Sequence, residues 1–272
     1  MRKRRKRNKL TVLAAVLLIL VGLGTAAFYG WQIYSTEQEY KEGDDAYDLI
    51  SQLATADPDK ENVEPGEIPA PPVQEENLQE LEENNVPIID LEAVQDINEE
   101  IACWLYSPDT VIDYPVCQGE DNEYYLYHLA DGTYNRNGCL FVDYRNAFDF
   151  SDPNTLIYGH HMASGSMFAS LINYADQAYY DLHPVMYLTV NGRMYRMEIF
   201  SGYTTSMDSS AYELNFSTDH ELAEWLREIS AKSDFRPRAI TLSTDDRIVT
   251  LSTCAYSFQD ARYVVHGRLV AL

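Results

Sequence analysis

The N-terminal end is the strongest constraint on what this chain can fold into, because a basic segment leads directly into a long charge-free one. The first nine residues contain seven lysine or arginine side chains and no acid, and residues 10–36 contain no charge. The most apolar part, residues 10–31, has the length of a helix that crosses a hydrocarbon core of about 30 Å. The sequence therefore predicts a basic tail over residues 1–9 and a single transmembrane anchor over residues 10–31.

The same charge pattern predicts an orientation. Lysine and arginine are retained on the cytoplasmic side, so the N-terminus should stay in the cytoplasm and the remainder should lie outside the cell membrane. A cleaved signal peptide is the alternative, since the small residues 24–27 resemble a processing site, although the apolar run is longer than a usual signal-peptide core. Both interpretations export the rest of the chain.

The exported part is strongly acidic. Without the seven basic residues of the tail, 13 basic residues stand against 43 acidic ones, so residues 10–272 carry a formal charge of −30. Such a surface repels phosphate backbones, which makes nucleic acid a poor partner.

Composition divides the exported part in two. Residues 37–86 are rich in Glu, Asp, Pro and Asn and lack the apolar residues of a core, which predicts a stalk over residues 32–86 with short helical pieces near 40–53 and 73–83. From Pro87 onward, apolar and aromatic residues become dense. Residues 87–272 are long enough for one domain with its own core.

Most of this domain has strand-like patterning, and a mainly β fold is predicted. Helical periodicity is confined to residues 220–230, which follow capping residues at 217–219, and to a shorter stretch at 166–174. A closed barrel with a few peripheral helices is favoured over an open sheet because closure removes strand edges. The predicted strands are residues 102–106, 111–116, 138–143, 155–158, 185–190, 193–204, 248–253 and 263–270.

Two of these strands bring together residues with chemical potential. Cys254 follows the alternating run 247–253, and after a short segment the chain resumes as a strand at Arg262. If the two strands pair as a hairpin, Cys254 and Arg262 face each other across its mouth. A guanidinium there would lower the thiol pKa or stabilise the oxyanion formed when a thiolate attacks a carbonyl.

A third member has to come from elsewhere in the chain. An apolar strand at residues 155–158 runs into Gly159, His160 and His161, and a histidine near a cysteine serves as general acid and base. Spacing does not decide between the two histidines. Taken singly, a cysteine after a strand is more often a small buried hydrophobe, and a histidine pair fits a turn or a metal site. Metal is the weaker interpretation, because no HExxH or CxxC pattern accompanies it.

The other cysteines are Cys103, Cys117 and Cys139. Cys103 and Cys117 flank an expected hairpin that turns at residues 107–110, and symmetric pairing about that turn sets Cys103 opposite about residue 114. A bridge between these two is therefore not favoured. The count fits one reactive thiol and three unpaired cysteines, with one bridge among the three left open.

The residues around Cys254 and Arg262 resemble the pattern of a known family. The segment Thr250-Leu-Ser-Thr-Cys254 resembles the TLxTC signature of sortases, and Arg262 lies where that family places its essential arginine. Further stretches resemble class B sortases over nearly all of residues 90–272. They are Asp96–Asn98 with Trp104, Ile112–Val116, Asp121-Asn122 with Tyr125-Leu126, Gly138–Asn146, Asn154–Met162, Gly165–Phe168 and Arg262–Arg268.

The resemblance implies an eight-stranded β-barrel and a set of roles. The histidine after Tyr-Gly is the catalytic one in the family, which selects His160 over His161. Cys254 would be the nucleophile and Arg262 would hold substrate and oxyanion. Ser252, Thr253 and Asn122 would shape the substrate pocket. The family needs no metal or organic cofactor, and Cys103, Cys117 and Cys139 have no assigned place in its pattern.

The implied reaction is a transpeptidation. A sorting signal on a surface protein or pilin is cleaved after threonine to give a thioacyl enzyme, and an amine of lipid-linked cell-wall precursor resolves it. A pilin-polymerising sortase and a hydrolytic cysteine peptidase with the same triad remain alternatives. A non-catalytic module is disfavoured by the intact triad, and an L,D-transpeptidase by the wide separation of His160 from Cys254.

Overall fold

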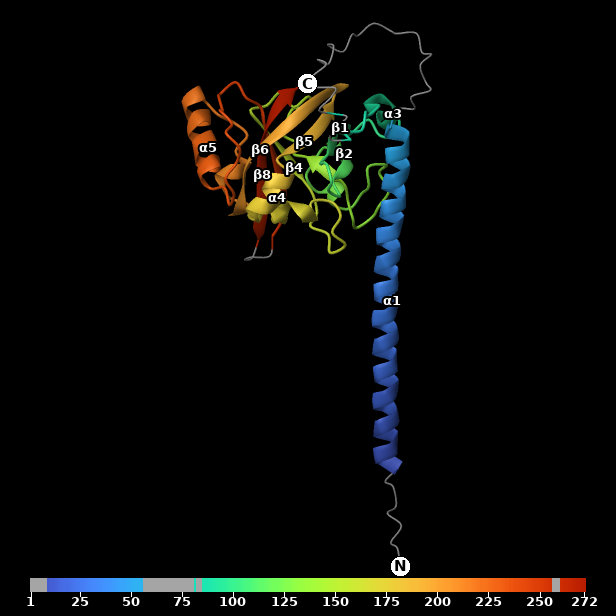
Figure 1. Cartoon of the computed structure of the whole chain (residues 1–272). Coiled ribbons are helices and arrows are strands. Elements are labelled where there is room, and N and C mark those ends of the chain that lie inside the picture. Colours follow the sequence, from blue (N-terminus) through green and yellow to red (C-terminus); the bar gives the residue numbers. More distant parts are fainter. Residues whose placement is uncertain (1–8, 56–80, 82–84, 256–259) are drawn as a thin grey trace, which may run out of the picture. The chain divides into compact units, whose positions relative to one another are not determined.

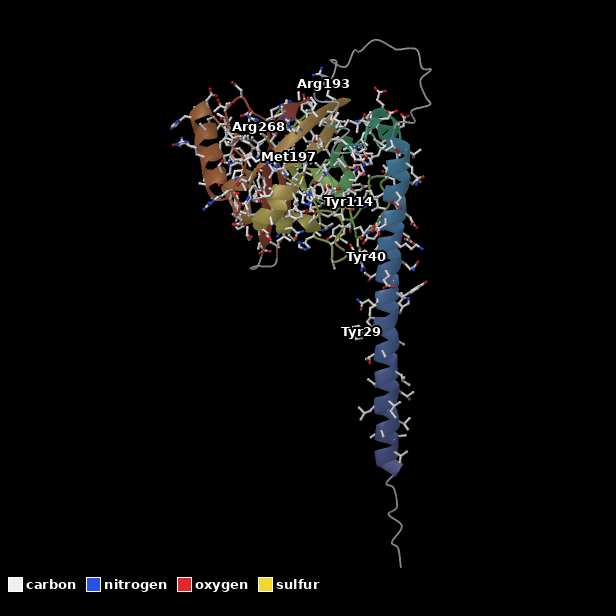
Figure 2. All side chains as sticks on the ribbon, in the orientation of Figure 1. Tyr29, Tyr40, Tyr114, Arg193, Met197 and Arg268 are labelled. Atoms are coloured by element: carbon white, nitrogen blue, oxygen red, sulfur yellow. The ribbon has the colours of Figure 1, made fainter. Side chains whose placement is uncertain are left out.

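The computed structural model describes residues 9–55, 81, 85–255 and 260–272. Its first element is helix α1 (Lys9–Ala54), which is uninterrupted and covers both the predicted anchor and the beginning of the predicted stalk. Within the described part of the chain, α1 is the one helix long and apolar enough to cross a membrane. From Val12 onward, the apolar side chains in its first half are exposed, as Tyr29 is in Figure 2. The predicted segment 73–83 lies almost entirely outside the described residues.

The compact unit that begins at Asp45 is built on a closed eight-stranded barrel (Figure 1). Around the barrel the strands follow the order β1-β2-β3-β4-β7-β8-β6-β5. Closure pairs both edges of every strand, as the sequence analysis predicts for so many short strands. The strands are β1 (Ile101–Tyr106), β2 (Asp113–Cys117), β3 (Leu140–Val142), β4 (Asn154–Tyr158), β5 (Val185–Val190), β6 (Arg193–Ser206), β7 (Ile248–Cys254) and β8 (Ala261–Ala271).

Two parallel pairings set the position of distant segments. β2 lies parallel to β3, and β4 lies parallel to β7 with Tyr158 opposite Ser252. The remaining neighbours are antiparallel, including the long β6–β8 ladder and the β7–β8 hairpin. Because a parallel pair requires a crossover connection, β4 and β7 meet only after a long stretch of intervening chain that includes β5, β6 and four helical segments.

The helices that follow α1 are short and lie outside the barrel. They are α3 (Leu91–Gln95), η1 (Tyr124–Leu126), η2 (Ala169–Ala175), α4 (Gln177–Leu182), η3 (Ser210–Tyr212) and α5 (Asp219–Ala231). The predicted helix at 220–230 is α5, whose N-cap Thr218 accepts a hydrogen bond from the Glu221 N–H. Its apolar face packs Trp225 and Ile229 against Phe200 and Val264 of the barrel. This amphipathic pattern is why the helix was predictable.

The end of α1 belongs to the barrel unit. Tyr47, Ile50 and Ala54 are buried, and the Tyr47 hydroxyl donates a 2.7 Å hydrogen bond to the Gly138 carbonyl. The Tyr47 ring also packs edge-on against Tyr114 at 5.4 Å between centroids. Residues that composition assigns to a stalk therefore contribute to the core of this unit.

The β1–β2 hairpin corrects one detail of the sequence analysis. Its turn is closed by the Ser107 N–H on the Ile112 carbonyl, so Cys103 pairs with Val116 and not with residue 114. The prediction was wrong because it placed the turn one residue too early. The described cysteines are all free, and Cys103, Cys117 and Cys139 are buried while Cys254 is half-buried.

Candidate active site

The β7–β8 hairpin positions the predicted cysteine and arginine. The two strands pair as predicted, antiparallel, with Cys254 opposite Arg262 at the last rung. Alternation along β7 places Ser252 on the same face as Cys254 and the buried Thr253 on the other. Cys254 therefore stands at a strand end with its main chain held on one side by β8.

The predicted histidines follow β4, the other neighbour of β7. The ladder continues one step past the last assigned pair, because the Gly159 N–H donates to the Ser252 carbonyl at 3.1 Å. A Cβ atom at position 159 would collide with Leu140 and Phe168 side chains, so glycine is what lets the chain pass this point. His160 comes next and reaches the end of β7 where Cys254 lies.

A cleft of about 370 Å³ joins these segments. It includes all six residues that the sequence analysis names as site residues. The lining consists of Asn122, Leu126, Phe141, Arg145, Tyr158, Gly159, His160, Met207, Tyr212, Ser252, Thr253, Cys254 and Arg262.

The ring of His160 is oriented by the main chain of η1. Its Nε2 lies 2.8 Å from the Leu126 carbonyl oxygen. Because a carbonyl only accepts, Nε2 must carry a hydrogen, and Nδ1 is then the ring nitrogen that exchanges a proton in the neutral state. The structure thus selects one tautomer of His160.

Arg262 and Tyr212 also line the cleft. The Arg262 guanidinium donates to the Ala261 carbonyl at 3.0 Å and contacts the Met207 sulfur at 3.2 Å. The Tyr212 hydroxyl hydrogen-bonds to the Ser252 hydroxyl at 2.8 Å. Burial raises the pKa of Tyr212, while the Ser252 contact and the Arg262 charge oppose that rise. Tyr212 therefore stays protonated and available as a hydrogen-bond partner.

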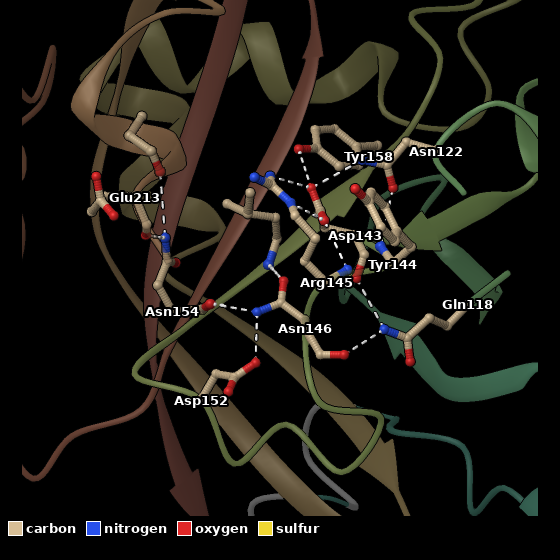
Figure 3. A network of polar contacts seen from close by, with 12 residues as sticks. Gln118, Asn122, Asp143, Tyr144, Arg145, Asn146, Asp152, Asn154, Tyr158 and Glu213 are labelled. Carbon is tan, nitrogen blue, oxygen red and sulfur yellow. Dashed lines mark hydrogen bonds and ion pairs between the residues drawn. The ribbon is translucent and has the colours of Figure 1, made fainter. Parts of the chain in front are cut away.

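A second arginine, Arg145, lines the cleft and is held there by a buried carboxylate (Figure 3). Asp143 is fully buried and accepts hydrogen bonds from Arg145 Nε and Nη2, each at 2.8 Å. Its Oδ2 also accepts from the Tyr158 hydroxyl at 2.9 Å and from Asn122 Nδ2 at 3.0 Å. The Asn122 carbonyl oxygen in turn accepts from the Tyr144 N–H. One carboxylate thus holds three cleft residues, Asn122, Arg145 and Tyr158, in fixed positions.

Electrostatics agree with an ionised Asp143. Burial alone raises the pKa of this carboxyl, but the hydrogen bonds from Arg145, Tyr158 and Asn122 outweigh burial and leave its pKa below the usual value. Burial and the adjacent Asp143 charge both raise the pKa of Tyr158, so its hydroxyl remains a donor. The negative charge of Asp143 is therefore fully paired with hydrogen-bond donors, which a charge needs in order to be stable when buried.

Sequence reasoning missed Arg145, Tyr158, Leu126 and Tyr212 as cleft residues. The first three lie within or beside stretches that carry the class B resemblance, yet no local pattern singled them out. Tyr212 lies in η3, 40 residues before its hydrogen-bond partner Ser252, and carried no signal. Within the ranges that the structure describes, no three His, Cys, Asp or Glu side chains gather as a metal site would require.

Comparison with known proteins identifies the family. The family model described as "Sortase domain" matches residues 105–270, more than half of the chain. The chain therefore belongs to the sortase family, whose members are cysteine transpeptidases acting on proteins with sorting signals.

The similar proteins place the chain in the class B branch of the sortase family. Sortase B of Listeria monocytogenes is 34% identical over 255 residues, 93% of this chain and 95% of that protein. The crystal structure of sortase B from B. anthracis in complex with AAEK1 superposes with a TM-score of 0.69 at 33% identity, covering 86% of this chain and 99% of the other. A sortase B complexed with triglycine matches with a TM-score of 0.63 at 32% identity, covering 67% and 86%. The resemblance inferred from the motifs is confirmed, as is the eight-stranded barrel.

Proposed function

We propose that this sortase cleaves a sorting signal after threonine and transfers the new carboxyl end to an amine of lipid-linked cell-wall precursor. Cys254 is the nucleophile, His160 the general acid and base, and Arg262 the oxyanion and substrate ligand. The observation that supports this most directly is the β7–β8 register, which sets Cys254 opposite Arg262 in a cleft that His160 also lines.

The first half-reaction makes a thioester. The Cys254 thiol gives its proton to His160 Nδ1, and the resulting thiolate bonds to the threonine carbonyl carbon. The negative charge that develops on the carbonyl oxygen is stabilised by the Arg262 guanidinium. The carbon–nitrogen bond then breaks, and the leaving amine takes a proton from His160 Nδ1. The contact of Nε2 with the Leu126 carbonyl keeps the ring oriented during this transfer.

The second half-reaction reverses these roles. An incoming amine gives its proton to His160 Nδ1, attacks the thioester carbonyl and releases the Cys254 sulfur as the new amide forms. The similar sortase B that was solved with triglycine was bound to a peptide bearing a terminal amine, the type of acceptor that the proposal requires. The acceptor here would be an amine of the wall precursor.

Substrate selection falls to the walls of the cleft. Ser252, Thr253 and Asn122 shape the pocket, with Asn122 held by Asp143 and the Tyr144 N–H. Arg145 is the second cation of the cleft, and its side chain is 51% exposed. A guanidinium fixed by a buried carboxylate offers its remaining N–H groups to substrate carbonyl oxygens.

We also propose that residues 10–31 anchor the enzyme in the cell membrane as a single pass, with residues 1–9 in the cytoplasm and the barrel outside. The apolar stretch of α1 and the seven basic residues before Leu10 support this orientation. The same proposal divides the remainder into a stalk over residues 32–86 and a catalytic domain over residues 87–272, with residues 45–54 at the end of α1 packed into the barrel unit.

The test is mass spectrometry of the full chain in detergent with peptides of the form x-P-x-T-[GN]. Incubation without an amine should give a thioester adduct on Cys254, and addition of triglycine should convert it into a new amide. The Cys254→Ala variant should form neither while keeping the circular dichroism spectrum of the parent.

Other outcomes have defined meanings. Release of free acid alone, with every amine supplied, would assign a hydrolytic peptidase to the same triad. Resolution only by a lysine-bearing pilin peptide would assign pilus assembly. If no peptide acylates Cys254, the proposed function is wrong.

A further inference from the structure

The carbonyl group of Cys254 has an unusual hydrogen-bond donor. In a parallel ladder, donors recur every second residue, so the bond from Gly159 N–H to the Ser252 carbonyl predicts a next rung from residue 161 to the Cys254 carbonyl. That rung is present, but it is made by the ring of His161, whose Nδ1 lies 3.0 Å from the Cys254 carbonyl oxygen. The acceptor is a carbonyl, so Nδ1 must carry the hydrogen.

The main chain has left the ladder at this point, which explains why a side chain is needed. The His160 carbonyl accepts from the Phe168 N–H at 3.0 Å, and His161 forms an isolated bridge with Met167. The segment after Gly159 therefore turns away from β7 and pairs with itself. His161 reaches back and supplies the donor that the departing backbone would otherwise have provided.

The peptide group that contains the Cys254 carbonyl is also held at its N–H end. The Ala255 N–H donates to the Ala261 carbonyl at 2.9 Å, closing the β7–β8 hairpin. The peptide between Cys254 and Ala255 thus has both its carbonyl and its N–H fixed, by two different segments of the chain. Because the preceding residues are held in the β7–β8 ladder, fixing this peptide plane also fixes ψ of Cys254 and the direction in which its Cα–Cβ bond leaves the strand.

His161 acts from outside the substrate cleft. It does not line the cleft that contains His160, Cys254 and Arg262. It lines a separate cavity of about 500 Å³, between the β1–β2 turn at Thr110 and the η2 segment at Ser170. The two consecutive histidines therefore line two different cavities, and of these two contacts only that of His161 is to the main chain of β7.

We propose that His161 is a positioning residue for the nucleophile, holding the Cys254 carbonyl so that the thiol is aimed at His160 and the substrate carbonyl. The inference rests on the proposed function of Cys254. A reacting atom displaced by about 1 Å costs on the order of 100-fold in rate, so loss of this contact should act on the chemical step and leave peptide binding nearly unchanged.

The test compares three substitutions with a matched control, all in the full chain in detergent. His161→Ala removes the donor. His161→Asn places an amide N–H at nearly the distance of Nδ1 from Cα, whereas His161→Gln places it at the distance of Nε2. His183→Ala is the control, because His183 Nδ1 makes the same type of contact, 3.1 Å to the Pro108 carbonyl, and His183 is outside the cleft lining.

Rates of acyl-enzyme formation should separate these variants. We expect His161→Ala and His161→Gln to lower kcat by about 10- to 100-fold with KM changed less than about two-fold, and His161→Asn to recover to within about three-fold of the parent. His183→Ala should keep the parental kcat. The inference is overturned if His161→Ala keeps the parental kcat, if its effect appears in KM alone, or if Asn fails to rescue.

A second measurement does not depend on turnover. Long-range nitrogen–proton spectra of the histidine rings, taken where the rings are neutral, should show His161 protonated on Nδ1 and His160 on Nε2. A His161 ring protonated on Nε2 would overturn the inference even if every variant loses activity or fails to fold. If no peptide acylates Cys254, the proposed function fails, while the ring spectra still test the contact with the Cys254 carbonyl.

Discussion

Replacement of Asp143 by asparagine is the sharpest test of the network behind the cleft. Asparagine keeps Oδ1, which accepts from the main-chain N–H and Nε of Arg145 at 3.0 and 2.8 Å. It places an amide NH₂ where Oδ2 accepts from Arg145 Nη2, the Tyr158 hydroxyl and Asn122 Nδ2. The Tyr158 hydroxyl can rotate and accept, but the other two groups only donate. Two donors therefore lose their partner.

The loss of stability expected in Asp143→Asn depends on how exposed each of these donors is. Removing one member of a fully buried ion pair costs about 3–5 kcal/mol, and a hydrogen bond to a charged group contributes about 1.5–3 kcal/mol. The Arg145 side chain is 51% exposed and can turn to water, so its share is discounted. We expect a loss of about 2 kcal/mol in the free energy of unfolding, equal to about a 30-fold change in the unfolding equilibrium constant.

The stability difference between the parent and Asp143→Asn should decrease as the pH falls. The pKa of Asp143 is lower in the folded protein than its usual value, so its stabilising contribution is present above the pKa of the unfolded chain, about 3.9. That contribution is lost as the pH falls through the folded-state pKa. The difference between parent and Asp143→Asn should therefore be largest near pH 7 and shrink in acid.

Urea unfolding of residues 45–272 at neutral and acidic pH measures both quantities. The control is Asp245→Asn, an exposed aspartate whose replacement should change stability by less than about 0.5 kcal/mol. An Asp143→Asn variant as stable as the parent at pH 7, or a difference that grows in acid, would refute the role assigned to the carboxylate.

Three further predictions concern the active cleft and the core. Arg262→Lys should slow acyl-enzyme formation by about 100-fold despite conserving charge, because lysine lacks the planar fork; single-turnover mass spectrometry with near-parental rates would contradict this. A thiol reagent should titrate one cysteine in the native protein and four in denaturant, since only Cys254 is accessible, and fewer than four would reveal a disulfide. A chain starting at residue 87 should be less stable than one starting at residue 45 by about 3 kcal/mol or more, because it lacks the buried Tyr47 and Ile50; equal thermal midpoints would refute that packing.

Local patterns explain why much of this fold was predictable. The β7–β8 hairpin is short, and alternation along both strands was enough to predict that Cys254 lies opposite Arg262. The α5 helix carried both its capping residue and its apolar face in one short stretch of consecutive residues. The β1–β2 hairpin shows the limit of this reasoning. Alternation does not fix the position of the turn, and the true turn pairs Cys103 with Val116 instead of the predicted residue 114.

The choice between the two histidines shows where local patterns stop. Spacing alone left His160 and His161 open, and only the resemblance selected His160. The tertiary structure gives each a separate partner, the Leu126 carbonyl for His160 and the Cys254 carbonyl for His161. Neither partner is near its histidine in the sequence, so no window of sequence contains the information.

The sequence by itself determined the membrane-compatible N-terminus, the strand inventory, the hairpin that carries Cys254 and Arg262, and the family. Only the tertiary structure brought Leu126, Arg145, Tyr158 and Tyr212 into the same cleft. Asp143 meets Tyr158 and Asn122, and Tyr47 reaches Gly138, through contacts that join segments well separated along the chain. Hydrophobic periodicity specifies which face of an element is buried, but not which element covers it. That second choice is made by the parallel pairing of β2 with β3 and of β4 with β7, whose energy is realised only when the whole barrel closes.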